Sequence, residues 1–96
     1  MPGRGAITGT VVVKGGGNMP LPGANVSIFY GELTTPYATG QTNFHGVFNL
    51  ELVLSGAAKL SISYIGLETL NTDIHVNDSY QTTDLGTLYM SSGREQ

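Results

Sequence analysis

The sequence predicts an all-β domain built as a sandwich of seven short strands. Three observations support this class. Apolar and polar residues alternate in several short segments, which is typical of strands with one buried face. Turn-forming residues separate these segments at intervals near ten residues, and no segment shows a helical period. Fourteen glycines, many β-branched residues and few alanines, glutamates or lysines also favour strands and turns over helices.

Seven segments are predicted as strands, and Gly9 in the first marks a position where another element packs close. In the clearest strand, Leu60, Ile62 and Tyr64 point inward and alternate with polar residues. The third segment is the most polar and is predicted at a sheet edge. In order, the strands are Ile7–Lys14, Ala24–Tyr30, Tyr37–Thr42, Val47–Leu52, Ala58–Ile65, Leu67–Val76 and Thr83–Met90.

Two connections have recognisable turn chemistry. Glycines and prolines, Pro20 among them, predict that Gly15–Gly23 is a loop that cannot join a ladder. Asn43 and Gly46 predict a tight hairpin turn, since glycine readily adopts positive φ and asparagine tolerates it. Phe48 is expected to fill the core beneath that turn.

Length and charge bound the organisation of the chain. Ninety-six residues suffice for one domain, which we place at residues 6–90, with residues 1–5 and 91–96 as linkers or terminal edges. Residues 1–5 resemble no signal peptide, so we expect this module to belong to a larger protein with any export signal upstream. Four cations against seven carboxylates exclude a nucleic-acid or polybasic membrane surface, and no apolar stretch is long enough to cross a bilayer.

No group of residues predicts catalysis, a metal or a cofactor. The chain has no cysteine and two histidines, His45 in a turn and His75 on an outward strand face, which is too few for a zinc site or a catalytic triad. Glu51 and Glu68 are outward, with no cleft expected between them. Oxygen-bearing side chains near the sixth strand are of the type that binds calcium, but their spacing favours turn-forming roles. These residues are Asp73, Asn77, Asp78 and Asp84.

The candidate contact surface is the polar edge strand together with exposed tyrosines. Tyr37, Thr39 and Gln41 lie on or beside that strand, and Tyr80 lies in a late loop. Open edge strands can pair with another chain, so this surface is predicted to act in β-augmentation. The remaining tyrosines are predicted to lie at the rim of the core or to be isolated on the surface.

Several motifs in order resemble a known family. They are ITGTVVV at Ile7–Val13, LPGANVSI at Leu21–Ile28, TGQTNFHGVFNLEL at Thr39–Leu52, LSISYIGLET at Leu60–Thr69 and DLGTLYM at Asp84–Met90. Together they resemble the carboxypeptidase regulatory-like domain, most closely the version at the start of SusC-type TonB-dependent outer-membrane receptors of Bacteroidetes. The chain departs from that pattern at Asn43, where aspartate is more usual, and at Leu67, where an aromatic residue is common.

The resemblance implies a seven-stranded immunoglobulin-like or transthyretin-like sandwich without catalytic activity. It implies an accessory module on the periplasmic side of the outer membrane or elsewhere in the cell envelope. Its partner would be the rest of the parent protein or a neighbouring envelope protein. Two alternatives stay open. One is a carbohydrate-binding module, with a glycan bound at Tyr37, Tyr80 and the loops Gly15–Gly23 and Asn77–Gln81; the other is a structural appendage of a secreted peptidase or adhesin.

Overall fold

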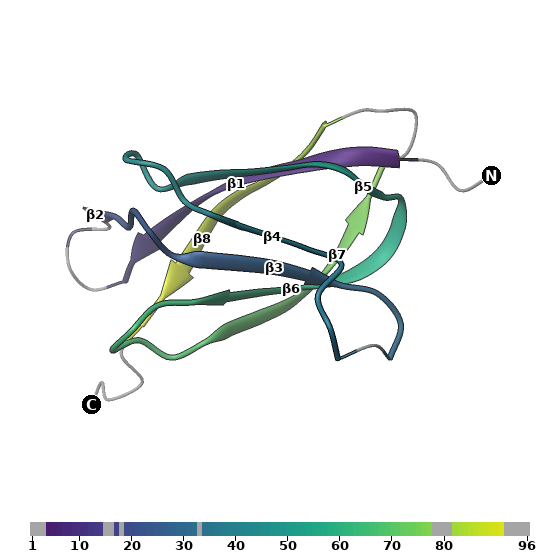
Figure 1. Cartoon of the computed structure of the whole chain (residues 1–96). Helices are drawn as coiled ribbons and strands as arrows, with labels where there is room; N and C mark the ends of the chain where they lie inside the picture. Colours follow the sequence, from purple (N-terminus) through teal and green to yellow (C-terminus); the bar gives the residue numbers. More distant parts are fainter. Residues whose placement is uncertain (1–3, 15–16, 18, 33, 78–81, 92–96) are drawn as a thin grey trace.

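The protein folds into two β-sheets packed face to face (Figure 1). This computed structural model describes residues 4–14, 17, 19–32, 34–77 and 82–91. Every regular element in these ranges is a strand, so the predicted all-β sandwich is confirmed. Within the same ranges, no helix is long and apolar enough to span a membrane.

The first sheet is organised around β1 (Arg4–Val13). On one side, β1 pairs antiparallel with β5 (Val47–Leu54) and, near its end, with the short β2 (Met19–Pro20). On the other side, β1 pairs in parallel with β8 (Thr82–Met90). The strands nearest the two ends of the chain are therefore hydrogen-bonded neighbours that run in the same direction.

The second sheet is antiparallel throughout, in the order β4–β3–β6–β7. Its strands are β4 (Ala38–Gln41), β3 (Asn25–Phe29), β6 (Gly56–Ser63) and β7 (Leu70–Val76). The polar strand predicted at an edge is β4, which lies at one edge of this sheet.

The structure corrects the predicted strand count and the predicted loop. The described residues form eight strands rather than seven, because β2 lies inside the segment predicted as a loop. Pro20 pairs with Val12, and no strand described here covers the far side of β2. At such an edge the missing proline N–H leaves no partner unsatisfied, and the next ladder bond runs from Leu21 N–H to Val11 O at 2.9 Å.

The turn after β4 is not the hairpin that was predicted. It joins β4 in the second sheet to β5 in the first, and the two strands are not paired. The predicted turn chemistry is nevertheless present: the Asn43 side chain accepts hydrogen bonds from the N–H groups of His45 and Val47, and Gly46 has φ of 78°. Gly46 O then accepts a hydrogen bond of 2.8 Å from Val11 N–H. The turn is therefore a corner between sheets that is fastened to β1.

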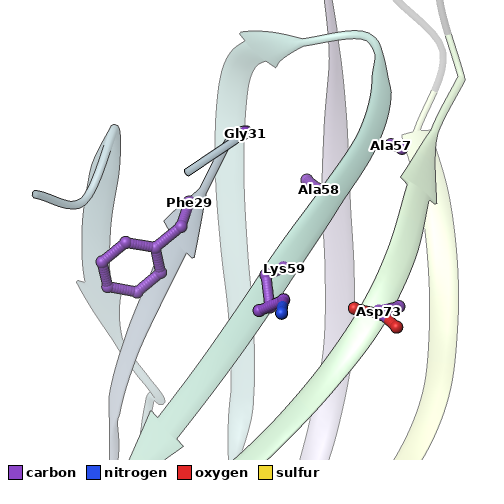
Figure 2. A pocket seen from close by; sticks show the side chains of 6 residues that line it. All are labelled: Phe29, Gly31, Ala57, Ala58, Lys59 and Asp73. Atoms are coloured by element: carbon purple, nitrogen blue, oxygen red, sulfur yellow. The ribbon is translucent and has the colours of Figure 1, made fainter. Parts of the chain in front are cut away.

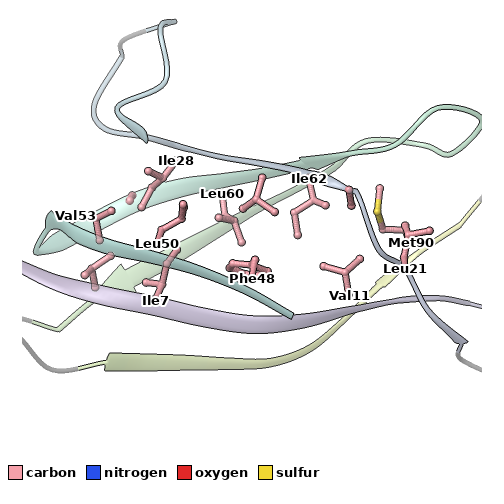
Figure 3. Close-up of a cluster of buried hydrophobic side chains, with 14 residues drawn as sticks. Ile7, Val11, Leu21, Ile28, Phe48, Leu50, Val53, Leu60, Ile62 and Met90 are labelled. Carbon is pink, nitrogen blue, oxygen red and sulfur yellow. The ribbon is translucent and has the colours of Figure 1, made fainter. Parts of the chain in front are cut away.

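The core lies between the inner faces of the two sheets (Figure 3). Phe48 is its largest fully buried side chain, only 1% exposed. Its ring lies against Gly9, where an added Cβ would come within 2.9 Å of two ring carbons, so the predicted close approach at Gly9 is confirmed. The buried cluster consists of Ile7, Val11, Leu21, Ala24, Val26, Ile28, Phe48, Leu50, Val53, Ala58, Leu60, Ile62, Val76 and Met90.

Thr42 is a buried polar residue that ties the segment before β3 to the end of β4. Its hydroxyl donates to Leu21 O at 2.6 Å and accepts from Ala24 N–H at 2.9 Å. Both backbone groups lie at the rim of the core, where an unsatisfied polar group is costly.

We expect Thr42→Val to lower the free energy of unfolding by about 1–3 kcal/mol, because it keeps the side-chain shape and leaves those two backbone groups without a partner. Urea unfolding followed by circular dichroism measures the change. Thr39→Val, at an exposed position on β4, is the matched control and should change stability by less than about 0.5 kcal/mol. Equal effects of the two variants would contradict the role assigned to Thr42.

Candidate interaction surface

The edge strand β4 presents unpaired backbone groups to solvent. It pairs with β3 through an unbroken register from Asn25–Gln41 to Ile28–Ala38. Thr42 N–H bonds to Ala24 O, so the alternation of an antiparallel ladder directs the backbone groups of Thr39 and Gln41 away from β3. Among the described strands, none pairs with β4 on that side.

The other edges of the two sheets carry features that oppose pairing with a further strand. Asp73 and His75 are exposed on β7, which places charged or ionisable groups along that edge. The register of β8 shifts opposite β1 near Gly86, whose N–H is bound by the Asp84 carboxylate at 2.9 Å. A similar register shift interrupts β5 between Leu50 and Val53. By contrast, β4 has no charge and no bulge, and is therefore the edge best suited to accept another strand.

The predicted contact residues fall on this edge with one exception. Thr39 and Gln41 are exposed on the outer face of the second sheet, and Gln41 Nε2 donates to Asn25 Oδ1 at 3.0 Å. Tyr37 precedes β4, is 43% exposed, and packs edge-to-face against Tyr30 with ring centroids 5.3 Å apart. Tyr80 lies outside the described residues, so its place in the surface stays a prediction.

Tyr30 anchors this aromatic pair to the sandwich. It is half-buried against the core, and its hydroxyl donates to Leu54 O. Burial raises the pKa of Tyr30, and the nearby Tyr37 raises it further, while the hydrogen bond to Leu54 lowers it. The tyrosine is therefore neutral near pH 7, and it fixes Tyr37 beside the open edge.

The outer face of the second sheet also contains a shallow hollow that was not predicted. Phe29, Lys59 and Asp73 lie in one row across β3, β6 and β7, because Phe29 pairs with Lys59 and Lys59 with Asp73 (Figure 2). Together with Gly31, Ala57 and Ala58 these residues line a volume of about 180 Å³. The available signal was Phe29 itself, an aromatic residue at an outward position of its strand.

The described residues do not bring together a catalytic or metal-binding group. His45 is exposed in the β4–β5 turn, and His75 is exposed on β7. No set of three histidine or carboxylate side chains in the described ranges is close enough to hold a metal ion. Glu51 lies on β5, whereas Glu68 precedes β7 instead of lying within the predicted strand, and its N–H bonds to Ser91 O. Asp78, part of the calcium reading, lies outside the described residues.

Comparison with known proteins identifies the family. The model of the carboxypeptidase regulatory-like domain matches residues 6–90. The chain belongs to this family. No curated protein matches the chain.

Solved structures with the same fold belong to different functional classes. The minor pilin GBS52 of Streptococcus agalactiae is 14% identical, with a TM-score of 0.70 over 95% of this chain and 45% of the pilin. The 3-chlorocatechol 1,2-dioxygenase of Rhodococcus opacus is 12% identical, with a TM-score of 0.69 over 95% of this chain and 61% of the enzyme.

A putative carbohydrate-binding protein of Pseudomonas aeruginosa is 13% identical, with a TM-score of 0.64 over 92% of this chain and 89% of that protein. This chain therefore spans less than two thirds of the pilin and of the dioxygenase. Because a pilin, an enzyme and a putative carbohydrate-binding protein share the fold, the likeness shows the fold and assigns no function.

Proposed function

We propose that this domain is a non-catalytic accessory module of a larger cell-envelope protein, which docks a neighbouring segment along β4. The observation that carries the proposal is the open, uncharged and unbroken edge of β4. A segment added there would pair with the outward backbone groups of Thr39 and Gln41, and Tyr37 would lie beside it. The family, and the occurrence of this fold as part of longer chains such as a pilin, support an appended role.

The motif order further supports a specific parent, a SusC-type TonB-dependent receptor of the outer membrane. In that setting the domain lies on the periplasmic side and docks the receptor itself or a periplasmic partner. The reading frame that encodes this chain tests the assignment. A signal peptide upstream, with a plug-like segment and barrel strands downstream, is the expected result; a peptidase or adhesin downstream would overturn it.

Docking along β4 is tested by a photo-crosslinking amino acid at Gln41 in the full-length parent protein, in its native envelope. We expect a crosslink that Thr39→Pro reduces at least tenfold, because proline removes an outward N–H without removing a hydrogen bond to β3. Thr39→Val should leave the crosslink unchanged, since it removes only the hydroxyl.

The same crosslinker at Glu51, exposed on β5 of the other sheet, is the positional control and should give no product that depends on Thr39. If Thr39→Val abolishes the crosslink as fully as Thr39→Pro, the partner recognises a side chain and backbone pairing is wrong. If no crosslink forms at Gln41, β4 is not the docking edge.

A further inference from the structure

We infer that one end of the second sheet contains a carbohydrate site, in which two adjoining hollows each accept one ring of a neutral sugar chain. One hollow lies on the outer face of the sheet and the other lies beside the β5–β6 connection. The first hollow is the one beside Phe29, with a volume of about 180 Å³ (Figure 2). The second has about 280 Å³ and is lined by Ser55, Gly56, His75, Val76 and Asn77. They adjoin because Ala57, in the wall of the first, pairs across the β6–β7 ladder with His75, in the wall of the second.

The size of the hollows limits what they can hold. Pockets that enclose a drug-sized ligand have volumes of roughly 300–1,000 Å³, and each hollow here is smaller. Each therefore accepts a ring-sized group and leaves the rest of the ligand in solvent. Two such hollows in succession suit a ligand with repeated rings better than a single compact molecule.

The first hollow combines an aromatic wall with paired polar groups. Phe29 is half-buried, so part of its ring is available to pack against the apolar C–H face of a sugar. Lys59 donates hydrogen bonds and the Asp73 carboxylate accepts them, as vicinal hydroxyl groups require. Although Lys59 and Asp73 are cross-strand partners, these two described side chains do not form an ion pair with each other. Their polar atoms therefore do not satisfy each other.

The charges of the site favour a neutral ligand. An anion approaching Lys59 also meets Asp73, and a cation approaching Asp73 also meets Lys59, so neither sign is favoured overall. The second hollow offers a serine hydroxyl, an imidazole and an asparagine amide, which can donate to or accept from hydroxyl groups. A neutral chain rich in hydroxyl groups can form hydrogen bonds in both hollows. A charged peptide would be attracted by one of the two charges, Lys59 or Asp73, and repelled by the other.

This site is separate from the proposed docking edge. The first hollow lies over β3, β6 and β7, and the second lies beside the β5–β6 connection and the end of β7, whereas docking uses the backbone of β4 at the sheet edge. The carbohydrate inference therefore does not depend on the proposed docking function, and Thr39→Pro should bind sugar as the unmodified chain does.

The test is a nitrogen-15 NMR titration of this chain with maltohexaose, cellohexaose, xylohexaose and mannohexaose, each to about 10 mM because an open site is expected to bind with Kd on the order of 1 mM. At least one of the four should shift the amides of Phe29, Lys59 and Asp73. Asp73→Ala should weaken that binding about tenfold, as loss of a hydrogen bond to a charged group predicts.

Phe29→Ala should weaken binding similarly, whereas Glu51→Ala, which removes an exposed carboxylate from the other sheet, should leave it unchanged. Asp73 is exposed, so its variant stays folded even if Phe29→Ala does not. The inference is overturned if none of the four hexasaccharides shifts these amides, or if the shifts map to β4 instead. Binding that disappears at high salt would also overturn it, because that result indicates recognition of a charge.

Discussion

Phe48→Ala is expected to lower the free energy of unfolding by about 3–5 kcal/mol. The side chain is 1% exposed and lies between the sheets, so its removal loses both the transfer free energy of the ring and the packing around it (Figure 3). A loss of this size is a large fraction of the roughly 5–15 kcal/mol that stabilises a typical domain. Urea unfolding monitored by circular dichroism at low temperature measures it.

A double-mutant cycle with Gly9 provides the control for Phe48. Alone, Gly9→Ala should destabilise the fold, because its Cβ would lie 2.9 Å from the Phe48 ring. In the Phe48→Ala background the same methyl group enters the vacated space, so its cost should disappear or reverse. Strict additivity of the two substitutions would contradict the close packing of the ring on Gly9.

Gly46→Ala is expected to cost about 2–4 kcal/mol, from backbone strain and from disrupted hydrogen bonds. Gly46 has φ of 78°, and an added Cβ would lie 2.7 Å from Val11 O and 3.0 Å from Leu21 N. Those two backbone atoms form a hydrogen bond, which holds Leu21, just after β2, to β1. The added methyl group would displace one or both atoms and weaken that bond. Thermal and urea unfolding measure the loss.

Gly66→Ala is the matched control for this prediction. Gly66 has a similar φ of 86° in the β6–β7 turn, but beyond its two chain neighbours no residue has an atom within 4 Å of its added Cβ. It should therefore show the conformational strain alone, about 1–2 kcal/mol. If the two alanine variants are equally destabilised, the close approach of Gly46 to β1 contributes nothing.

Apart from β2, the strands were predictable because one face of each is more buried than the other. In β6, for example, Leu60 and Ile62 are fully buried, and their neighbours Lys59 and Ser61 are not. Burial on one face imposes a period of two on the sequence, and that period is visible without knowing the partner strands. The turn residue Asn43 was also predictable, because its preference for turns is a property of the residue itself.

The pairing of the strands was not predictable from these local patterns. The parallel ladder of β1 with β8 joins Val13 to Met90, and nothing near either residue specifies the other. The corner between β4 and β5 has the same residues as a hairpin turn, and only the pairing of β5 with β1 distinguishes the two. The short strand β2 forms because the end of β1 is free to pair with it. This pairing outweighs the preference of glycine and proline for loops.

Surface features were likewise predictable where they depend on one strand, and not predictable where they depend on how strands pair. Polarity alone indicated that β4 lies at an edge, and Thr39 and Gln41 are exposed there. The hollow beside Phe29 depends on register, because Phe29, Lys59 and Asp73 become neighbours only when β3, β6 and β7 align. Within its own strand, only Phe29 gives a signal, as an aromatic residue at an outward position; Lys59 and Asp73 give none.

The parallel pairing of β1 and β8 has a mechanical consequence. Because the two strands run in the same direction, β1 begins at one end of the sandwich and β8 finishes at the other, about 30 Å away for a strand of this length (Figure 1). Tension applied through the two ends of the domain pulls these neighbours past each other along their length. The ladder bonds then resist as a group instead of opening one after another, so a pull at the two ends loads the whole β1–β8 ladder at once.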